Sequence, residues 1–336
     1  MFDSVLNVGG VLARNGIALA PMAGVADVPF RQLAWELGAG YLVSEMVSSL
    51  DHLWDTKKNR LRRVLLKGVY PNVIQIAGSD PIELSETAKK VVDEGADIVD
   101  INFGCPAKKV CKKFVGSALL DDIPRIGRIV EAVVGSVSVP VTIKTRIGST
   151  PSDLIGIEAS YIAQEAGAQL VVMHSRSRAC RFKGPVDHEK TAKLKSRLKI
   201  PFFVNGDISS KHSAALALRE SGAHGVMVGR GAVGQPWIFR ELLGEEELSL
   251  PEKWRIVRRH LSLSYDFYGK AAGLKMMKKH IKAYLIKLGC EDLSAKAMKL
   301  EDPDVMRRLL SVDQILEWNN LGKAIESNQS AYQRIE

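Results

Sequence analysis

Short apolar runs rich in β-branched residues alternate along this chain with stretches whose apolar residues recur at helical spacing. The eight runs occupy residues 17–20, 41–46, 72–77, 97–102, 141–146, 170–174, 201–206 and 225–229. The stretches between them are amphipathic, and several end on a glycine of the kind that closes a helix. This alternation indicates repeated βα units and a parallel sheet.

Eight strands in about 230 residues match the number and length of a (β/α)8 barrel, the TIM barrel. We therefore predict an α/β fold in which a TIM barrel occupies residues 1–245. A doubly wound open sheet is the alternative, because periodicity does not show whether a sheet closes.

The pattern changes after Leu243. A polar, acidic segment leads to Pro251, and only helical periodicity follows it up to Glu336. Residues 253–287 read as two amphipathic helices. We predict a second, all-helical domain over residues 250–336.

The positive charge of the chain is concentrated in the stretch 253–287. The formal net charge is +9, and this stretch holds ten Lys or Arg residues and one acidic residue, so the rest of the chain sums to zero. Such a local excess favours a polyanionic partner.

Composition bears on location and redox state. No apolar run approaches the roughly 20 residues that cross a bilayer, and the N-terminus lacks the features of a signal peptide. The four cysteines are scattered without a C-x-x-C pair, which favours reduced thiols and no metal site. We expect a cytoplasmic monomer that binds no membrane.

Polar and glycine residues follow most of the predicted strands. In a TIM barrel, catalytic residues come from the carboxyl ends of the strands, where the βα loops converge. The residues at these ends are Pro21, Met22, Ala23, Gln75, Asn102, Cys105, Lys144, Arg146, His174, Asn205, Gly206, Asp207, Gly229 and Arg230. Seven such groups on separate units indicate an active site.

The ends of the last two strands suggest a phosphate site. Barrels often bind phosphate with the loops after strands seven and eight. Asn205-Gly206-Asp207 and Gly229-Arg230 offer close backbone amides and a guanidinium. Ordinary turn glycines are the alternative. Residues 229–234 also spell G-x-G-x-x-G, but no second βαβ unit follows to carry the acidic partner of a dinucleotide fold.

Lys144 and His174 end adjacent strands. A lysine at this place can stabilise the negative charge of a reduced flavin, and Gln75 can hydrogen-bond the edge of its ring. A solvent-directed lysine and a structural imidazole are the alternatives for the first two residues.

Cys105 is the candidate for the chemistry. It stands between Gly104 and Pro106, on a loop rather than a helix. An unperturbed thiol keeps its proton at neutral pH, so Cys105 can serve as a proton donor or a nucleophile. A structural cysteine is the alternative.

With these segments in view, the chain resembles the tRNA-dihydrouridine synthases, and most closely their bacterial B-type members. The resemblance covers nearly the whole chain. It is carried by APMAGVADVPFR (20–31), VSEMVSS (43–49), QIAGSDP (75–81), DINFGCPAKKV (100–110), GSALL (116–120), VTIKTRIG (141–148), HSRSRACRFKG (174–184), NGDI (205–208), VGRGAVGQPWIFRE (228–241), DFYG (266–269) and KKH (278–280).

The resemblance implies an FMN-dependent oxidoreductase that uses NADPH to reduce uridines in the D-arm of tRNA to 5,6-dihydrouridine. Hydride would pass from flavin N5 to uracil C6, and Cys105 would protonate C5. Asn102 and Arg178 match positions that contact the base. The matching cofactor positions are Pro21, Met22, Ala23, Gln75, Lys144, His174, Asn205, Gly206, Asp207, Gly229 and Arg230. The chain departs from the family at Ser175, where glycine is usual, and this adds a side chain beside the flavin site.

Two basic clusters are candidates for contacts with tRNA phosphates. Lys275, Lys278, Lys279 and Lys282 share one helical face. A second cluster after strand two consists of Lys57, Lys58, Arg60, Arg62 and Arg63. A solvated charged face is the alternative for each cluster.

Two other functions remain open. A flavin barrel acting on a free small molecule would need no basic helical domain. An RNA-binding protein on a barrel scaffold would bind no flavin and carry out no chemistry.

Overall fold

Eight parallel strands close into a barrel in the structure, a computed structural model that describes residues 4–311. In ring order the strands are β3 (Ile17–Leu19), β4 (Tyr41–Val43), β6 (Asn72–Ala77), β7 (Ile98–Asn102), β8 (Val141–Arg146), β9 (Leu170–His174), β10 (Phe202–Asn205) and β11 (Gly225–Val228). The pairing of β4 with β6 and of β11 with β3 completes the ring. The predicted barrel is therefore confirmed, and the open sheet is excluded.

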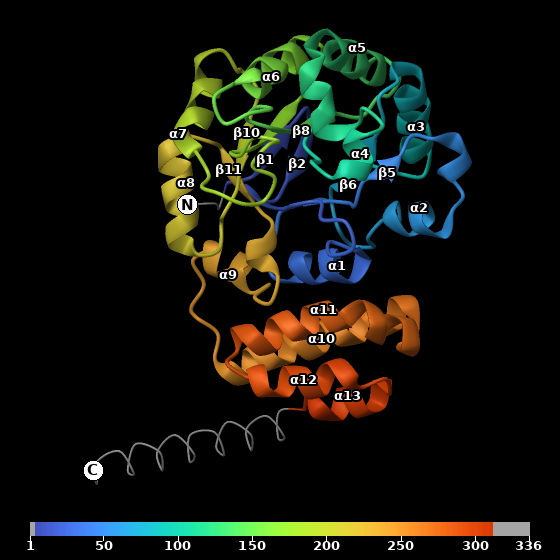
Figure 1. The fold of residues 1–336 in the computed structure, drawn as a ribbon, viewed down its shortest axis with the longest axis vertical. Helices are drawn as coiled ribbons and strands as arrows, with labels where there is room; N and C mark the ends of the chain where they lie inside the picture. Colours follow the sequence, from blue (N-terminus) through green and yellow to red (C-terminus); the bar gives the residue numbers. More distant parts are fainter. Residues whose placement is uncertain (1–3, 312–336) are drawn as a thin grey trace. The chain divides into compact units, whose positions relative to one another are not determined.

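Helices surround the barrel, as Figure 1 shows. They are α1 (Val28–Glu36), α2 (Lys57–Arg62), α3 (Pro81–Asp93), α4 (Lys108–Cys111), α5 (Ile123–Val134), α6 (Ile155–Glu165), α7 (His188–Thr191), α8 (Lys211–Ser221) and α9 (Ile238–Leu242). Local sequence sets their beginnings. At α3, Asp80 accepts hydrogen bonds from the backbone N–H of Ile82 and Glu83, and Pro81 fits the first turn. The apolar faces of α3 and α5 pack against the outside of the strands in one core.

Short helical turns and small strands complete this unit. The 3₁₀ turns are η1 (Asp51–Leu53), η2 (Gly116–Asp121), η3 (Ala192–Ser196) and η4 (Arg230–Ala232). A two-residue strand, β5 (Val47–Ser48), pairs with the end of β6.

An antiparallel hairpin covers the amino end of the barrel. It consists of β1 (Leu6–Val8) and β2 (Val11–Ala13), which the sequence analysis did not predict. A side chain at Gly9 would come within 3.0 Å of Pro140 and Gln169, the residues that precede β8 and β9. The hairpin thus closes the end opposite the predicted active site, and Val8 and Ala13 join the apolar interior.

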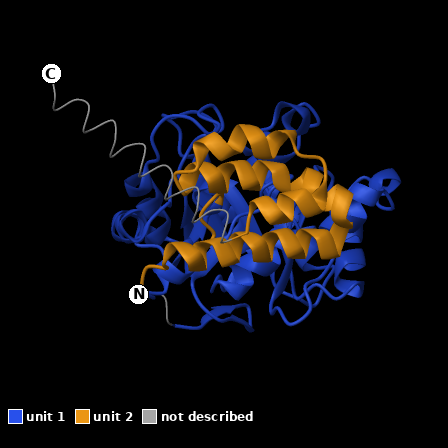
Figure 2. Cartoon of the chain, turned by 90° about the horizontal axis from the view of Figure 1, so that it is seen from below, with its two compact units in different colours: residues 1–232, 238–245 blue, residues 233–237, 246–336 orange. Residues whose placement is uncertain are grey.

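The helical unit, drawn in orange in Figure 2, has a core of its own. It consists of α10 (Leu250–Tyr268), α11 (Lys270–Lys287), α12 (Glu291–Lys299) and α13 (Pro303–Leu309). At Gly273, an added Cβ would lie 2.6 Å from the carbonyl oxygen of Ser264, so the missing side chain lets α11 approach α10 closely.

Each of the two compact units is formed by two separate segments of the chain. Val233–Trp237 groups with the helices from Glu246 onward, while Ile238–Glu245 groups with the barrel. Trp237 stacks on Tyr284 of α11, with ring centroids 6.2 Å apart. The predicted domain over 250–336 extends to residues 312–336, which lie outside the described part of the chain. Within residues 4–311, no helix is long and apolar enough to span a membrane.

Candidate active site

The predicted site residues on β7 to β10 converge at the carboxyl end of the barrel. Strand register places Asn102 beside Lys144, and His174 beside both Arg146 and Asn205. The Lys144 Nζ donates to Asn205 Oδ1 at 3.0 Å, from β8 to β10. Parallel strands bring these side chains to one rim, as the barrel prediction requires.

A chain of hydrogen bonds runs through the barrel interior to this rim. Tyr41 OH and Thr142 Oγ1 lie 3.2 Å apart, and Thr142 Oγ1 donates to Asp100 Oδ1 at 2.7 Å. Gln75 Nε2 donates to Asp100 Oδ2 at 2.7 Å. Asn102 Nδ2 donates in turn to Gln75 Oε1, also at 2.7 Å. The Gln75 side chain is thus held between two partners and keeps one amide proton for a ligand.

Asp100 is the charged member of this chain, and the sequence analysis did not single it out. It is fully buried, and this burial raises the pKa of its carboxyl to about 6. Hydrogen bonds from Gln75 and Thr142 oppose the rise. Asp100 therefore orients the Gln75 amide, whose position sets that of Asn102.

Asn102, held in this way, fixes the backbone of the loop that carries Cys105. Its Oδ1 accepts hydrogen bonds from the backbone N–H of Gly104 at 3.2 Å and of Cys105 at 2.9 Å. The carbonyl oxygen of Cys105 accepts from Ser117 N at 3.1 Å and from Ser117 Oγ at 2.9 Å. Both polar groups of the Cys105 backbone are therefore fixed.

The thiol of Cys105 is protonated at neutral pH. Burial raises the pKa of this thiol above its ordinary value, although Arg146 and Lys144 oppose the rise. Cys105 is a free thiol. A protonated thiol on a fixed loop suits a proton donor better than a thiolate nucleophile.

Arg146 holds the same loop through its side chain. Its guanidinium donates to three carbonyl oxygens, of Gly104 at 2.6 Å, Ser177 at 3.1 Å and Arg181 at 2.7 Å, and the residue is only 1% exposed. From the sequence, Arg146 was predicted to lie at a strand end, with no role of its own. The alternation along β8 is the signal that identifies it, because Thr142, Lys144 and Arg146 all lie on the same side of the strand.

His174 lies among basic side chains. Burial lowers the pKa of His174 well below its ordinary value, and nearby Lys144, Arg146, Arg176 and Arg230 lower it further. The imidazole is therefore neutral at physiological pH. Among residues 4–311, no group hydrogen-bonds to its ring, so both ring nitrogens are available to a ligand.

The charge of Lys144 changes with pH closer to neutrality than that of an ordinary lysine. Burial, followed by the proximity of Arg146, lowers the pKa of Lys144 to about 8. The ammonium is thus charged near neutral pH and would be stabilised by an anion at the rim.

The predicted phosphate corner is formed by the loops after β10 and β11. Gly206 has a φ of 132°, and an added Cβ would lie 2.6 Å from Val186 Cγ1, so only glycine fits there. Asp207 accepts from Arg176 Nη1 at 2.9 Å and lies 3.5 Å from Arg230 Nη2. Arg230 is 58% exposed, which leaves its guanidinium accessible to a phosphate.

The loop after β3 lies beside this corner. A Cβ at Gly229 would be 3.8 Å from Ala20 Cβ and 3.9 Å from Met22 Sδ. Pro21 and Met22 are half-buried and Ala23 is exposed. The added hydroxyl of Ser175 points elsewhere, because it lies 2.9 Å from both Thr191 Oγ1 and His188 Nδ1 on α7.

These residues fit a flavin mononucleotide. The basic groups around His174 would attract an anionic ligand. At Gly206 and Gly229 the absence of a side chain would let a phosphate come close to the backbone. The Gln75 amide and the His174 nitrogens offer polar atoms to a ring edge. No cluster of three or more metal-ligating His, Cys, Asp or Glu side chains is present within residues 4–311.

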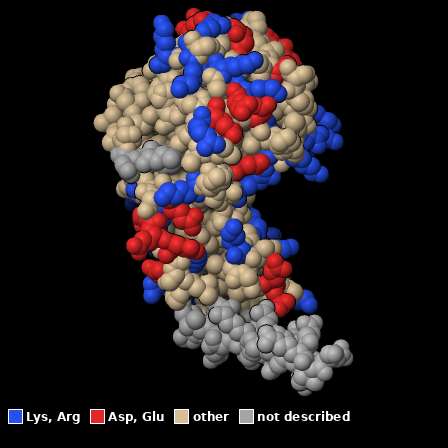
Figure 3. Space-filling model, turned by 90° about the vertical axis from the view of Figure 1, so that its left-hand side faces the viewer, with Lys and Arg blue, Asp and Glu red and all other residues tan. Residues whose placement is uncertain are grey.

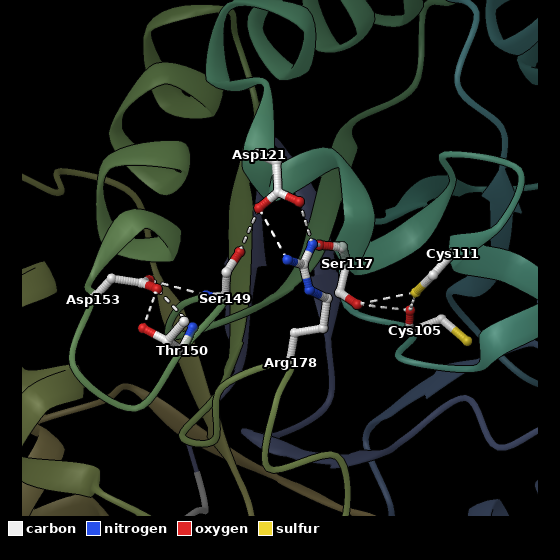
Figure 4. Close-up of polar contacts among 8 residues, drawn as sticks. All are labelled: Cys105, Cys111, Ser117, Asp121, Ser149, Thr150, Asp153 and Arg178. Carbon is white, nitrogen blue, oxygen red and sulfur yellow. Dashed lines mark hydrogen bonds and ion pairs between the residues drawn. The ribbon is translucent and has the colours of Figure 1, made fainter.

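Arg178 is the one predicted base contact that is engaged in an ion pair. Its Nη1 and Nη2 donate to the two carboxylate oxygens of Asp121, at 2.7 and 3.1 Å (Figure 4). Asp121 and Ser117 could not be identified as site residues from the sequence, because contacts between distant loops leave no spacing signal.

The predicted basic face of the helical unit is only partly exposed. Lys275, Lys279 and Lys282 are exposed on α11. Lys278 is half-buried and donates to the carbonyl oxygen of Met298 on α12 at 3.1 Å.

The basic cluster after β4 divides in a similar way. Lys57, Lys58 and Arg60 are exposed. Arg62 donates to the carbonyl oxygen of Met46, and Arg63 pairs with Glu94, so these two residues have structural partners.

A third basic group was missed as such by the sequence analysis. It consists of the exposed side chains of Lys108, Lys109, Lys112 and Lys113 on and after α4, a few residues from Cys105. On the face that Figure 3 draws, by contrast, basic and acidic side chains of the barrel unit are interspersed.

Comparisons with known proteins bear on this site. The sequence profile of the Dihydrouridine synthase family matches residues 18–315. The tRNA-dihydrouridine synthase B of Pseudomonas aeruginosa is 43% identical over 309 residues, which cover 90% of this chain and 93% of that protein. The tRNA-dihydrouridine synthase B of Escherichia coli is 42% identical over 287 residues, covering 83% and 89% of the two chains.

Solved structures agree on the fold. Histamine dehydrogenase from Rhizobium sp. 4-9 superposes with a TM-score of 0.56 at 12% identity, covering 78% of this chain and 50% of that one. An old yellow enzyme homologue from Zymomonas mobilis gives a TM-score of 0.53 at 13% identity, covering 75% and 95%. At these identities the likeness concerns the barrel architecture alone.

Proposed function

Because this chain belongs to the dihydrouridine synthase family and is an oxidoreductase, we propose that it reduces D-loop uridines of tRNA to 5,6-dihydrouridine. We propose FMN as its prosthetic group and NADPH as its reductant. The observation that carries the proposal is the convergence, on one barrel rim, of a protonated thiol and a group of basic side chains suited to a flavin nucleotide.

The cofactor would be held by residues from several strand ends. The phosphate would lie against Gly206, Gly229 and Arg230, with Asn205 and Asp207 completing the corner. Gln75, Lys144 and His174 would face the ring, and Pro21, Met22 and Ala23 would line its side. When bound there, FMN would supply hydride, taken from NADPH, to C6 of the uracil.

The protein's own part in the reaction is to bind, orient and protonate. Cys105 donates the proton of its Sγ to C5 of the uracil as the ring is reduced. Lys144 contributes a positive charge that favours the reduced flavin. Asn102 holds the Cys105 backbone and keeps its amide near the base.

The target base must leave the RNA stack to reach this rim. Phosphate contacts must then hold the tRNA from outside the pocket. We assign these contacts to the exposed lysines of α11 and, on the barrel unit, to those on and after α4. The exposed members of the cluster at α2 add further basic groups on the barrel.

The test separates the three candidate functions. Purified protein should be yellow, should bleach anaerobically with NADPH, and should regain its colour when unmodified tRNA is added. Colourless protein that binds tRNA would indicate an RNA-binding protein without chemistry. Protein that bleaches but is reoxidised by free small molecules and not by tRNA would indicate a small-molecule reductase. Mapping dihydrouridine in the product identifies the uridines that are reduced.

A further inference from the structure

One cluster of polar contacts joins three loops at the active-site rim (Figure 4). The loops follow β7, β8 and β9 and contribute Asp121, Ser149 and Arg178. Besides the bidentate ion pair with Arg178, Asp121 Oδ1 accepts a hydrogen bond from Ser149 Oγ at 2.9 Å. A guanidinium held on both oxygens of a carboxylate has a fixed orientation.

Backbone contacts reinforce the cluster. The N–H of Arg178 donates to the carbonyl oxygen of Gly148 at 2.8 Å, and the N–H of Ala179 donates to that of Ser149 at 3.0 Å. Although burial raises the pKa of Asp121, hydrogen bonds from Arg178 and Ser149 hold it below its ordinary value. Asp121 is therefore ionised at neutral pH and keeps the ion pair.

Hydrogen bonds through Ser117 connect this ion pair to Cys105. Arg178 Nη1 donates not only to Asp121 but also to the carbonyl oxygen of Ser117 at 3.1 Å. Ser117 in turn donates its N–H and its hydroxyl to the carbonyl oxygen of Cys105. Ser117 is fully buried, so its two partners leave it little freedom.

We propose that Asp121 is a positioning residue for the reaction, which fixes the backbone of Cys105 through Arg178 and Ser117. The proposal rests on the proposed function, in which Cys105 is the proton donor. Both terminal nitrogens of Arg178 are engaged within the protein. Arg178 therefore acts on the loop that carries the thiol, and Asp121 is as necessary as Arg178 itself.

Four variants test this: Asp121→Asn, Asp121→Ala, Arg178→Ala and the double Asp121→Ala/Arg178→Ala. The control is Glu158→Gln, which weakens an ion pair with Arg197 on the outside of the barrel. The first measurement is the rate at which iodoacetamide alkylates Cys105, located by peptide mass. The second is single-turnover oxidation of the NADPH-reduced enzyme by tRNA, with tRNA affinity and flavin reduction measured separately.

We expect faster alkylation of Cys105 in all four variants, because the loop is then held less firmly. We also expect tRNA-dependent oxidation to slow about ten- to a hundredfold, the effect of a misplaced catalytic group. Affinity for tRNA and the rate of flavin reduction should stay unchanged. The double variant should be no worse than either single one, since both act through the same contacts. Glu158→Gln should behave as wild type.

The opposite pattern would overturn the proposal. If Arg178→Ala is slow while both Asp121 variants match wild type, Arg178 acts on the base and not on the loop. Asp121→Asn is the variant closest in shape to the native residue. An unchanged rate of Cys105 alkylation in this variant would refute the positioning role, whatever the rate of oxidation by tRNA. A wild-type enzyme that tRNA fails to oxidise contradicts the proposed function instead, and the alkylation rates then decide the positioning role alone.

Discussion

At the scale of single residues, Cys105 combines a backbone that is held by hydrogen bonds with a thiol that keeps its proton at neutral pH. Asn102 and Ser117 hold its N–H and its carbonyl group. Burial raises the pKa of the thiol. A donor with a raised pKa stays protonated through neutral pH and into the alkaline range, so this group does not limit activity on the alkaline side until its own raised pKa is reached.

Replacing Cys105 by alanine should lower the rate of dihydrouridine formation by a factor of about 100 or more, the usual contribution of a general acid. Flavin content and tRNA affinity should stay unchanged, because the thiol binds neither in the proposed arrangement. Single-turnover oxidation by tRNA measures the rate. Cys180→Ala, on a neighbouring loop, is the control. Wild-type turnover in Cys105→Ala would remove the thiol from the chemistry.

Lys144 predicts how cofactor affinity depends on pH. Its pKa is lowered to about 8, so the free protein loses this charge as the pH rises through 8. An anionic ligand favours the protonated lysine and therefore binds best below that pH. We expect FMN affinity to be constant from pH 6 to about 7.5 and to fall above pH 8. Fluorescence titration of flavin-free protein measures it.

The matched variant is Lys144→Met. It should bind FMN more weakly than wild type at neutral pH, with no decline as the pH passes the pKa of the native lysine. If the variant shows the same decline as wild type, another group is responsible.

At the scale of elements, buried parallel strands were accessible from sequence because each one is a short β-branched run. The bounds of β6 and β8 match the predicted runs. The hairpin of β1 and β2 was missed because each strand has only three residues, too few for alternation to register. The local rule of a barrel, that loops at strand ends carry the chemistry, also located the candidate site.

Contacts between distant loops could not be predicted from the sequence. Arg178 and Asp121 are 57 residues apart in the sequence, and no local spacing relates them. Asn102 and Gln75 could be assigned to strand ends, but nothing in the pattern shows that Asp100 lies beside Gln75 in the barrel interior. Such pairings depend on how the closed ring brings separate loops together.

The exposed face of α11 predicts where tRNA is held. Lys275, Lys279 and Lys282 are exposed, whereas Lys278 is directed to α12. Changing the three exposed lysines to glutamine should weaken tRNA binding and reduce the salt slope by about 0.7 to 0.9 for each phosphate that is no longer neutralised. Filter binding over a range of salt concentrations measures both quantities.

Lys278→Gln is the internal control for this face. It should alter the salt slope little, and flavin reduction by NADPH should be normal in every variant. An unchanged affinity in the triple variant would place the tRNA on the barrel, at the lysines on and after α4 or the exposed residues at α2.

At the scale of the whole molecule, the described residues 4–311 form an apolar core in each of the two compact units. One lies in and around the barrel, and the other is formed by the helices from α10 onward with Trp237. All proposed FMN contacts belong to the barrel unit. A ligand that binds only the folded barrel stabilises that unit by about 2.7 kcal/mol at a concentration 100 times its Kd.

Calorimetry of the protein with and without FMN should therefore show two transitions, of which one moves. The barrel transition should rise by about 5 to 10 °C, given about 2 to 4 °C for each kcal/mol in a unit of this size. The helical transition should stay in place, because its core contains no flavin contact. Arg230→Ala, which removes a phosphate contact, should reduce the shift without altering the helical transition. A single transition that moves as a whole would mean that the two cores unfold together, and a helical transition that alone moves would place the flavin outside the barrel.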